Sequence, residues 1–280
     1  MSGLVRFVEE PRAVLIAWHG GATSAEYFDS PGHPLHSLMR VGASLGFTVL
    51  APSRPGYGDS RSALGDHISA ATQVDLSFAV VEEVLRGRSS GAGQFLVGHS
   101  QGCVLAVRMA ADPRGNELLG IEIAGTGVRH NERAVRVKQS IPEPGFDRSV
   151  LRNLLWGPEY YYRGHAKVVD SAPDFEAVDA STWSEEFTQL AREIALPVRI
   201  SLGDHEGWWQ SGSAGLESMR SLFRSSARVV VDEQYESGHN LSLGISALAY
   251  HLKVLAFAEE CVLMRERIDY DNKKLEMDNA

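Results

Sequence analysis

Short apolar runs alternate with segments of helical periodicity over most of this chain. The runs are brief enough for strands that are covered on both faces, and they lie at residues 13–18, 48–51, 95–98, 120–124, 198–202 and 228–231. Between two of them, Val74, Phe78, Val81 and Leu85 recur at the spacing of one helix face. This alternation predicts an α/β fold, with a mostly parallel central sheet flanked by helices.

Two stretches depart from this rhythm. Residues 127–196 contain no clear strand, which indicates a small, helical insertion between two parts of one core, residues 1–126 and 197–265. Residues 241–264 are rich in Leu, Ala, Ile and Val and predict a long, buried helix. Residues 266–280 mix charges with little apolar content, so we expect this tail to fray.

Composition narrows the functional classes. A chain of 280 residues with 44% hydrophobic residues can bury a large core. Its net charge of −9 gives no basic field that would attract nucleic acid or anionic membranes, so a small molecule is the expected partner. Residues 1–11 resemble neither a signal peptide nor a spanning helix, and the expectation is a cytoplasmic protein without membrane insertion. Cys103 and Cys261 lie too far apart for a paired-cysteine metal site, and buried thiols are expected.

The pentapeptide Gly98-His99-Ser100-Gln101-Gly102 is the strongest chemical signal. It follows an apolar strand and precedes a helical segment, which is the context of a serine held on a sharp strand-to-helix turn. Side chains two residues before and after the serine would crowd that turn, and glycine removes the crowding. Ser100 is therefore a candidate nucleophile.

A nucleophilic serine needs a base and a carboxylate that orients the base. His239 follows the last predicted strand and precedes the last helix, where a loop reaches back over the sheet. Asp204 leaves the strand at 198–202 on the same carboxyl edge as Ser100, the edge at which parallel sheets bind ligands. Gly21, after the first strong strand, and Gln101, after the serine, offer backbone N–H groups that would hold an oxyanion.

Taken in chain order, these motifs resemble the α/β-hydrolase family. The matching segments are Trp18-His19-Gly20-Gly21, Arg54-Pro55-Gly56-Tyr57-Gly58, the serine pentapeptide, Gly203-Asp204 and Gly238-His239. The resemblance spans residues 13–264 and implies a cap at 127–196 and a short antiparallel strand at 4–8. It also implies catalytic roles for Ser100, Asp204 and His239. Two other carboxylates lie near Asp204 in sequence, Glu206 and Asp232, and the choice among them stays open.

The insertion holds the only clues to specificity. Trp156, Tyr160, Tyr161 and Trp183 either line an apolar substrate pocket or form the core of the cap itself. Arg129, Arg133 and Arg136 fall on one helix face, which is either a solvated surface or an entrance for an anionic substrate.

The resulting hypothesis is a serine hydrolase without cofactor or metal that cleaves an ester, thioester or lactone of a small to medium apolar carbonyl substrate. The alternatives that use the same triad are an acyltransferase, a cyclising thioesterase and a carbon–carbon bond hydrolase. A ligand-binding receptor with this fold is the alternative from another class. The sequence leaves open whether the chain forms a homodimer.

Overall fold

A seven-stranded sheet forms the centre of the molecule, in the strand order β1-β3-β2-β4-β5-β6-β7. The computed structural model describes residues 1–64, 68–140, 147–164 and 168–278. The strands are β1 (Gly3–Arg6), β2 (Val14–Trp18), β3 (Thr48–Pro52), β4 (Gln94–His99), β5 (Gly120–Ala124), β6 (Val198–Gly203) and β7 (Val229–Gln234). Only β1 pairs antiparallel, against β3, and the other neighbours are parallel. The predicted fold class is confirmed.

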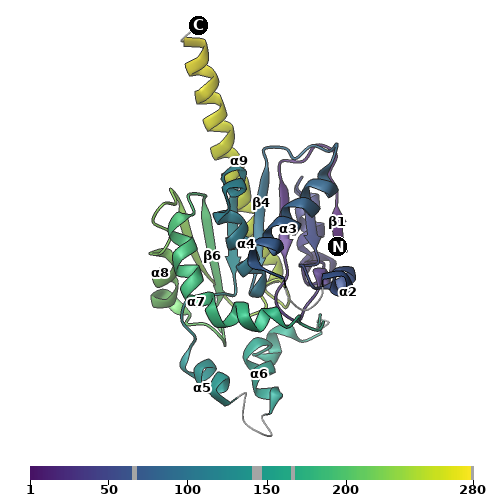
Figure 1. Ribbon diagram of the computed structural model, residues 1–280, viewed down its shortest axis with the longest axis vertical. Helices are drawn as coiled ribbons and strands as arrows, with labels where there is room; N and C mark the ends of the chain where they lie inside the picture. The colour runs from purple at the N-terminus through teal and green to yellow at the C-terminus, as the bar shows by residue number, and fades with distance from the viewer. Residues whose placement is uncertain (65–67, 141–146, 165–167, 279–280) are drawn as a thin grey trace.

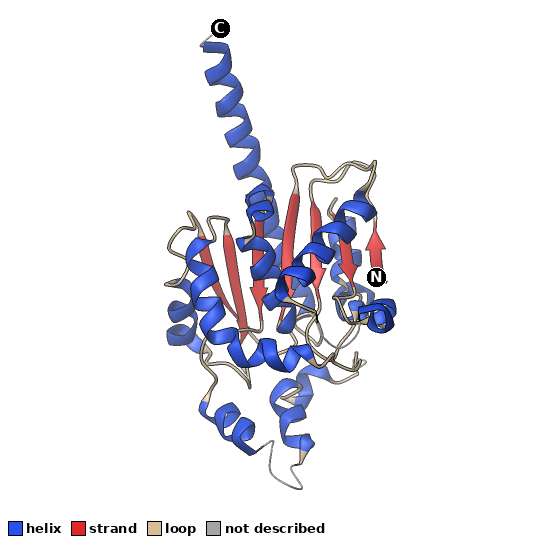
Figure 2. Ribbon diagram, in the orientation of Figure 1, coloured by secondary structure: helices blue, strands red, loops and turns tan. Residues whose placement is uncertain are grey.

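Helices cover both faces of the sheet, which explains why its central strands are apolar throughout (Figures 1 and 2). Alternate residues of β2 enter two separate cores, Val14 and Ile16 in one and Leu15 and Ala17 in the other. The first core also contains residues of α3 (Ala70–Leu85), α4 (Gln101–Ala111), α7 (Phe175–Glu193) and α8 (Gly212–Arg220). The second contains residues of α1 (Leu38–Ser44) and α9 (Ala247–Asp278).

In its described residues, the segment between β5 and β6 carries three α-helices, α5 (Glu132–Ser140), α6 (Arg148–Leu155) and α7. Helices α5 and α6 lie beyond the carboxyl edge of the parallel strands, whereas α7 crosses that edge and continues along the sheet (Figure 1). Trp183, Phe187 and Ala191 of α7 are buried in the first core. Helix α7 thus packs with the sheet, although the sequence predicted it as part of the insertion. Residues 141–146 and 165–167 of the predicted insertion lie outside the described residues.

The remaining elements are short. They are α2 (Arg61–Leu64) and the 3-10 helices η1 (Ala25–Phe28), η2 (Pro34–His36), η3 (Gly58–Ser60), η4 (Pro113–Glu117) and η5 (Glu159–Tyr162).

The last helix differs from its prediction at both ends. Helix α9 begins at Ala247, because residues 241–246 form turns that bury Leu241 and Leu243. It continues as a helix of 32 residues to Asp278, and its last turns project away from the sheet (Figure 1). The tail that we expected to fray is therefore helical as far as Asp278, and residues 279–280 lie outside the described residues. Within the described ranges, no helix combines the length and apolarity that a membrane span requires.

His251 lies on the buried side of α9, and neither of its ring nitrogens has a hydrogen-bond partner among the described residues. Burial, and to a lesser extent the nearby His36, lower the pKa of this imidazole from 6.5 to about 3. The folded protein therefore keeps His251 neutral, whereas the unfolded chain binds a proton as the pH falls below 6.5. The free energy of unfolding therefore decreases progressively as the pH falls from 6.5 to about 3.

Replacing His251 by phenylalanine should consequently reduce the sensitivity of the protein to acid. Between pH 8 and pH 5, the wild type should lose about 2 kcal/mol more stability than His251→Phe, because only the wild-type unfolded state gains this proton. Urea unfolding of both proteins at both pH values measures the difference. Because each protein is compared with itself at the two pH values, a change in packing caused by the substitution cancels. Equal losses of stability in the two proteins would contradict the prediction.

Candidate active site

Ser100 is the single residue between strand β4 and helix α4. Its backbone has φ 50° and ψ −117°, a positive φ that residues with side chains rarely adopt. The Ser100 N–H donates to the carbonyl of Ala124 at 2.8 Å, and the Ser100 carbonyl accepts from the N–H of Cys103 at 2.9 Å. These bonds to the neighbouring strand and the following helix hold the serine in the predicted strand-to-helix turn.

The glycines on either side of Ser100 allow this turn to pack. A Cβ on Gly98 would lie 2.8 Å from the Cα of Cys103, and a Cβ on Gly102 would overlap the carbonyl of Trp18 in β2. Strand β2 is the neighbour of β4 in the sheet, so the second glycine lets helix α4 begin directly against it. The motif thus reflects two close backbone approaches.

His239 lies in the loop after β7, and the structure brings it to Ser100 as predicted. Its Nε2 lies 3.1 Å from Ser100 Oγ, and its Nδ1 lies 2.9 Å from an oxygen of Glu206. The His239 carbonyl accepts a hydrogen bond from His99 Nε2 at 2.9 Å. Burial strongly lowers the pKa of His99. His99 is therefore a neutral neighbour that holds the His239 backbone.

Glu206, and not the predicted Asp204, is the carboxylate that contacts His239. The Asp204 carboxylate accepts the backbone N–H groups of Ser237 at 2.9 Å and Glu236 at 3.0 Å, and it contacts His205 Nδ1 at 3.0 Å. Burial acts to raise the pKa of Asp204, but these hydrogen bonds outweigh it and lower the pKa below its usual value. Asp204 is thus occupied in fixing the loop that carries His239.

The remaining candidate, Asp232, is excluded by its partners, since it pairs with Arg199 at 2.8 Å and Lys253 at 2.9 Å. The Glu206 side chain is fully buried. Its Oε1 also accepts the N–H of Trp208 at 2.7 Å, which orients the carboxylate toward the imidazole. Ser100, His239 and Glu206 therefore form one hydrogen-bonded chain.

Gly21 and Gln101 lie beside Ser100, at the positions predicted for oxyanion donors. A Cβ on Gly20 would lie 3.3 Å from Ser100 Cβ, and one on Gly21 would lie 3.0 Å from Gln101 Cγ. Gln101 is the first residue of α4, so its N–H has no acceptor within the helix. Across the described ranges, neither the Gly21 nor the Gln101 N–H has a hydrogen-bond acceptor. Two backbone donors are thus available next to the serine.

A cavity of about 510 Å³ opens above Ser100. Ser100, His239, Gly21 and Gln101 line its floor. Its walls are mostly apolar and come from α4, α6, α7 and the loops beside them; they include Val104, Leu151, Leu155, Trp156, Ala177, Ala180, Trp183, Trp208 and Trp209. Such a cavity suits an apolar molecule that places one polar group against the serine.

Two of the four predicted aromatic contacts line this cavity, namely Trp156 and Trp183. Tyr160 and Tyr161 do not: Tyr160 is 65% exposed, and the hydroxyl of Tyr161 contacts His205 Nδ1 at 3.2 Å. Both tyrosines belong to η5, and Tyr161 packs into the second core.

Sequence reasoning missed the pair Trp208-Trp209 in the loop after β6. Both tryptophans line the cavity, and their backbone N–H groups lie within hydrogen-bonding distance of Glu206, at 2.7 and 3.4 Å. The sequence signal that could have revealed them is the pair of adjacent tryptophans just after the candidate carboxylate Glu206.

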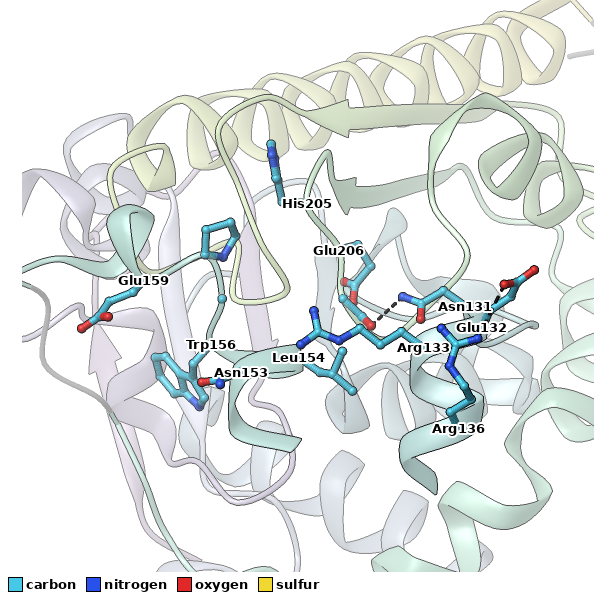
Figure 3. Close-up of a pocket in the computed structure, with 13 residues that line it drawn as sticks. Asn131, Glu132, Arg133, Arg136, Asn153, Leu154, Trp156, Glu159, His205 and Glu206 are labelled. Atoms are coloured by element: carbon cyan, nitrogen blue, oxygen red, sulfur yellow. Dashed lines mark hydrogen bonds and ion pairs between the residues drawn. The ribbon is translucent and has the colours of Figure 1, made fainter. Parts of the chain in front are cut away.

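A second hollow, of about 760 Å³, lies on the outer side of Glu206 (Figure 3). Arg133 and Arg136 of α5 line it, together with Glu132 and Glu159. Arg136 Nη1 lies 3.8 Å from Glu132, in an exposed pair within helix α5. Two residues of the predicted arginine face, Arg133 and Arg136, thus line this hollow. Within the described ranges, no group of three or more His, Cys, Asp or Glu side chains could hold a metal ion.

Solved structures with this architecture include lipases, esterases and a peptidase. The chain aligns with a monoacylglycerol lipase from Paleococcus ferrophilus at a TM-score of 0.60 and 18% identity, covering 93% of this chain and 100% of the other. A carboxyl esterase from Bacillus coagulans gives a TM-score of 0.61 and 17% identity over 91% and 92% of the two chains. A proline iminopeptidase from Mycobacterium smegmatis gives 0.60 and 18% over 94% and 95%. At these identities the likeness establishes the fold.

A search among curated proteins found no match. The sequence profile of the alpha/beta hydrolase family, in contrast, matches residues 14–243, which include β2, the serine turn and the loop of His239. The chain therefore belongs to the alpha/beta hydrolase family.

Proposed function

We propose that this protein is a serine hydrolase that cleaves carboxylic esters through an acyl-enzyme on Ser100. The observation that carries the proposal is the hydrogen-bonded chain from Ser100 Oγ through His239 to Glu206 on the floor of an apolar cavity. A hydroxyl hydrogen-bonded to an imidazole, which a buried carboxylate orients, is the arrangement that activates serine as a nucleophile.

In the first half-reaction, Ser100 Oγ forms a bond to the substrate carbonyl carbon while His239 Nε2 takes the hydroxyl proton. The Gly21 and Gln101 N–H groups stabilise the negative oxygen that develops. His239 then donates the proton to the leaving alcohol as the carbon–oxygen bond breaks. In the second half-reaction, His239 takes a proton from water, which attacks the acyl carbon, and returns it to Ser100 as the acid departs.

The cavity supports a small to medium apolar acyl group as substrate. Its walls offer mainly tryptophan and aliphatic side chains, with a few polar side chains such as Thr126 and Lys138 among them. Lipases and esterases among the similar structures favour the same substrate class. We assign residues 127–196 as an insertion into a core of residues 1–126 and 197–265, in which α5, α6 and η5 form the cap and α7 returns along the sheet.

A panel of 4-nitrophenyl esters from acetyl to decanoyl tests this proposal. We expect turnover that increases with acyl length until the cavity is filled and then declines, with a burst of 4-nitrophenol where deacylation is slower than acylation. The assignment would be overturned if the wild-type protein hydrolysed no ester of the panel and mass spectrometry detected no covalent acyl adduct.

A further inference from the structure

The Gly20–Gly21 peptide is held from its carbonyl side by buried side chains. The Gly20 oxygen accepts from Thr23 Oγ1 at 3.0 Å and Arg54 Nη2 at 3.1 Å, and it lies 2.9 Å from His19 Nδ1. In a planar trans peptide, the C=O and the N–H point in opposite directions. Whatever fixes the Gly20 carbonyl therefore also fixes the direction of the Gly21 N–H.

His19 contributes as a neutral ring whose tautomer is determined by its contacts. Burial lowers the pKa of His19 well below its usual value. Its Nε2 accepts the backbone N–H of Arg54 at 3.1 Å, so the ring proton is on Nδ1 and points to the Gly20 carbonyl. Arg54 thus contacts this carbonyl directly through its guanidinium and indirectly through His19.

The Arg54 guanidinium is only 4% exposed and pairs with Glu176, in the first turn of α7. The carboxylate oxygen that contacts Arg54 also accepts the hydroxyl of Tyr57 at 2.9 Å. The Tyr57 oxygen in turn accepts the N–H of Ala22 at 2.8 Å. Both ends of the segment from Gly20 to Ala22 are therefore bound to one buried network. Because Glu176, Ala177 and Ala180 line the cavity, this network joins the oxyanion segment to the cavity wall.

A buried ion pair can also have a purely structural role, in which it only holds two elements together. Helix α7 takes part in a second buried ion pair that serves for comparison. Arg108 of α4 pairs with Asp179 at 2.8 Å and Glu186 at 2.6 Å, and its side chain is 7% exposed. It links the core to α7 as Arg54 does. Arg108 makes no hydrogen bond to residues 19–23 within the described ranges. A purely structural role of Arg54 would give the two arginines the same effect on the enzyme.

We propose that Arg54 is a positioning residue that directs the Gly21 N–H at the developing oxyanion, and that Glu176 fixes Arg54 to helix α7 in this orientation. The proposal rests on the function proposed above. The Arg54 charge is balanced by Glu176, so its contribution is the geometry of the donor. Loss of that geometry weakens binding of the transition state more than binding of the ester.

The test compares Arg54→Met with the matched variant Arg108→Met, each assayed below its own melting temperature. Arg54→Met should lower kcat by about 10–10²-fold with little change in KM, which is less than the 10²–10³-fold loss typical of deleting a donor. Its affinity for an alkyl boronic acid, which forms a tetrahedral adduct on serine, should fall in parallel. Arg108→Met should lose thermal stability but keep kcat and boronate affinity within about twofold. Equal losses of kcat in the two variants would overturn the proposal.

Glu176→Gln and Asp179→Asn provide a second pair if either arginine variant does not fold. Glu176→Gln should have a reduced kcat and a reduced boronate affinity, whereas Asp179→Asn should keep both values. Failure of the proposed function would appear in the wild type, as absence of turnover and of an acyl adduct. Failure of the present proposal would appear as an active wild type whose paired variants behave alike.

Discussion

Replacing Glu206 by glutamine should lower kcat by about 10³–10⁴-fold, whereas Asp204→Asn should lower it by less than about tenfold. A glutamine amide has nearly the shape of the carboxylate but lacks its charge, so it no longer stabilises the imidazolium that forms when His239 takes the serine proton. It can also turn its NH₂ group toward Nδ1 and favour the wrong tautomer of His239. Initial rates with a good ester substrate measure both variants.

Asp204→Asn should act mainly on stability. The asparagine side chain would keep one carbonyl oxygen for the N–H groups of Ser237 and Glu236, which the wild-type carboxylate accepts with two oxygens. We therefore expect a lower melting temperature with kcat largely preserved, and the reverse pattern in Glu206→Gln. A larger loss of kcat in Asp204→Asn would identify Asp204 as the functional carboxylate and contradict the geometry.

Replacing Ser100 by alanine should reduce kcat by up to about 10⁶-fold while the fold and the cavity persist. The variant removes only the hydroxyl that approaches His239, and the backbone bonds that hold residue 100 to Ala124 and Cys103 remain. Binding of a product acid should be retained. It can be followed by the fluorescence of the tryptophans that line the cavity, Trp156, Trp183, Trp208 and Trp209.

Ser77→Ala provides the matched control. Ser77 is a buried serine of α3 whose hydroxyl donates to the Gln73 carbonyl at 2.7 Å, on an element that does not line the cavity. This variant loses a buried hydroxyl in the same way but should retain turnover. Wild-type rates in Ser100→Ala, or an equal loss in Ser77→Ala, would be inconsistent with a nucleophilic Ser100.

The sequence predicted best those features that depend on local chemistry. The sharp turn at Ser100 requires small residues at 98 and 102, so the motif is readable without knowledge of the fold. The central strands are apolar runs because helices cover them on both faces. Their predicted positions agree with the observed strands to within a few residues. The approach of His239 to Ser100 followed from the rule that parallel strands present their carboxyl ends at one edge.

Features that depend on the path of a distant loop could not be predicted. The roles of Asp204 and Glu206 are decided by which carboxylate receives the N–H groups of residues 236 and 237, and both residues lie in one short segment after β6. Likewise, Tyr160 and Tyr161 have the composition of a pocket wall, but in η5 Tyr160 is exposed to solvent and Tyr161 packs into the second core. The network around Gly20 joins Arg54 to Glu176 across 122 positions, so neither residue signals the other in the sequence.

Covalent labelling with a fluorophosphonate tests the central claim most directly. The reagent phosphonylates an activated serine with loss of fluoride, and intact-mass and peptide mass spectrometry locate the adduct. We predict one adduct on the wild-type protein, on the peptide that contains Ser100, formed much more slowly in Glu206→Gln and not at all in Ser100→Ala. An adduct on another residue, or labelling of Ser100→Ala at the wild-type rate, would contradict the assignment of Ser100 as the nucleophile.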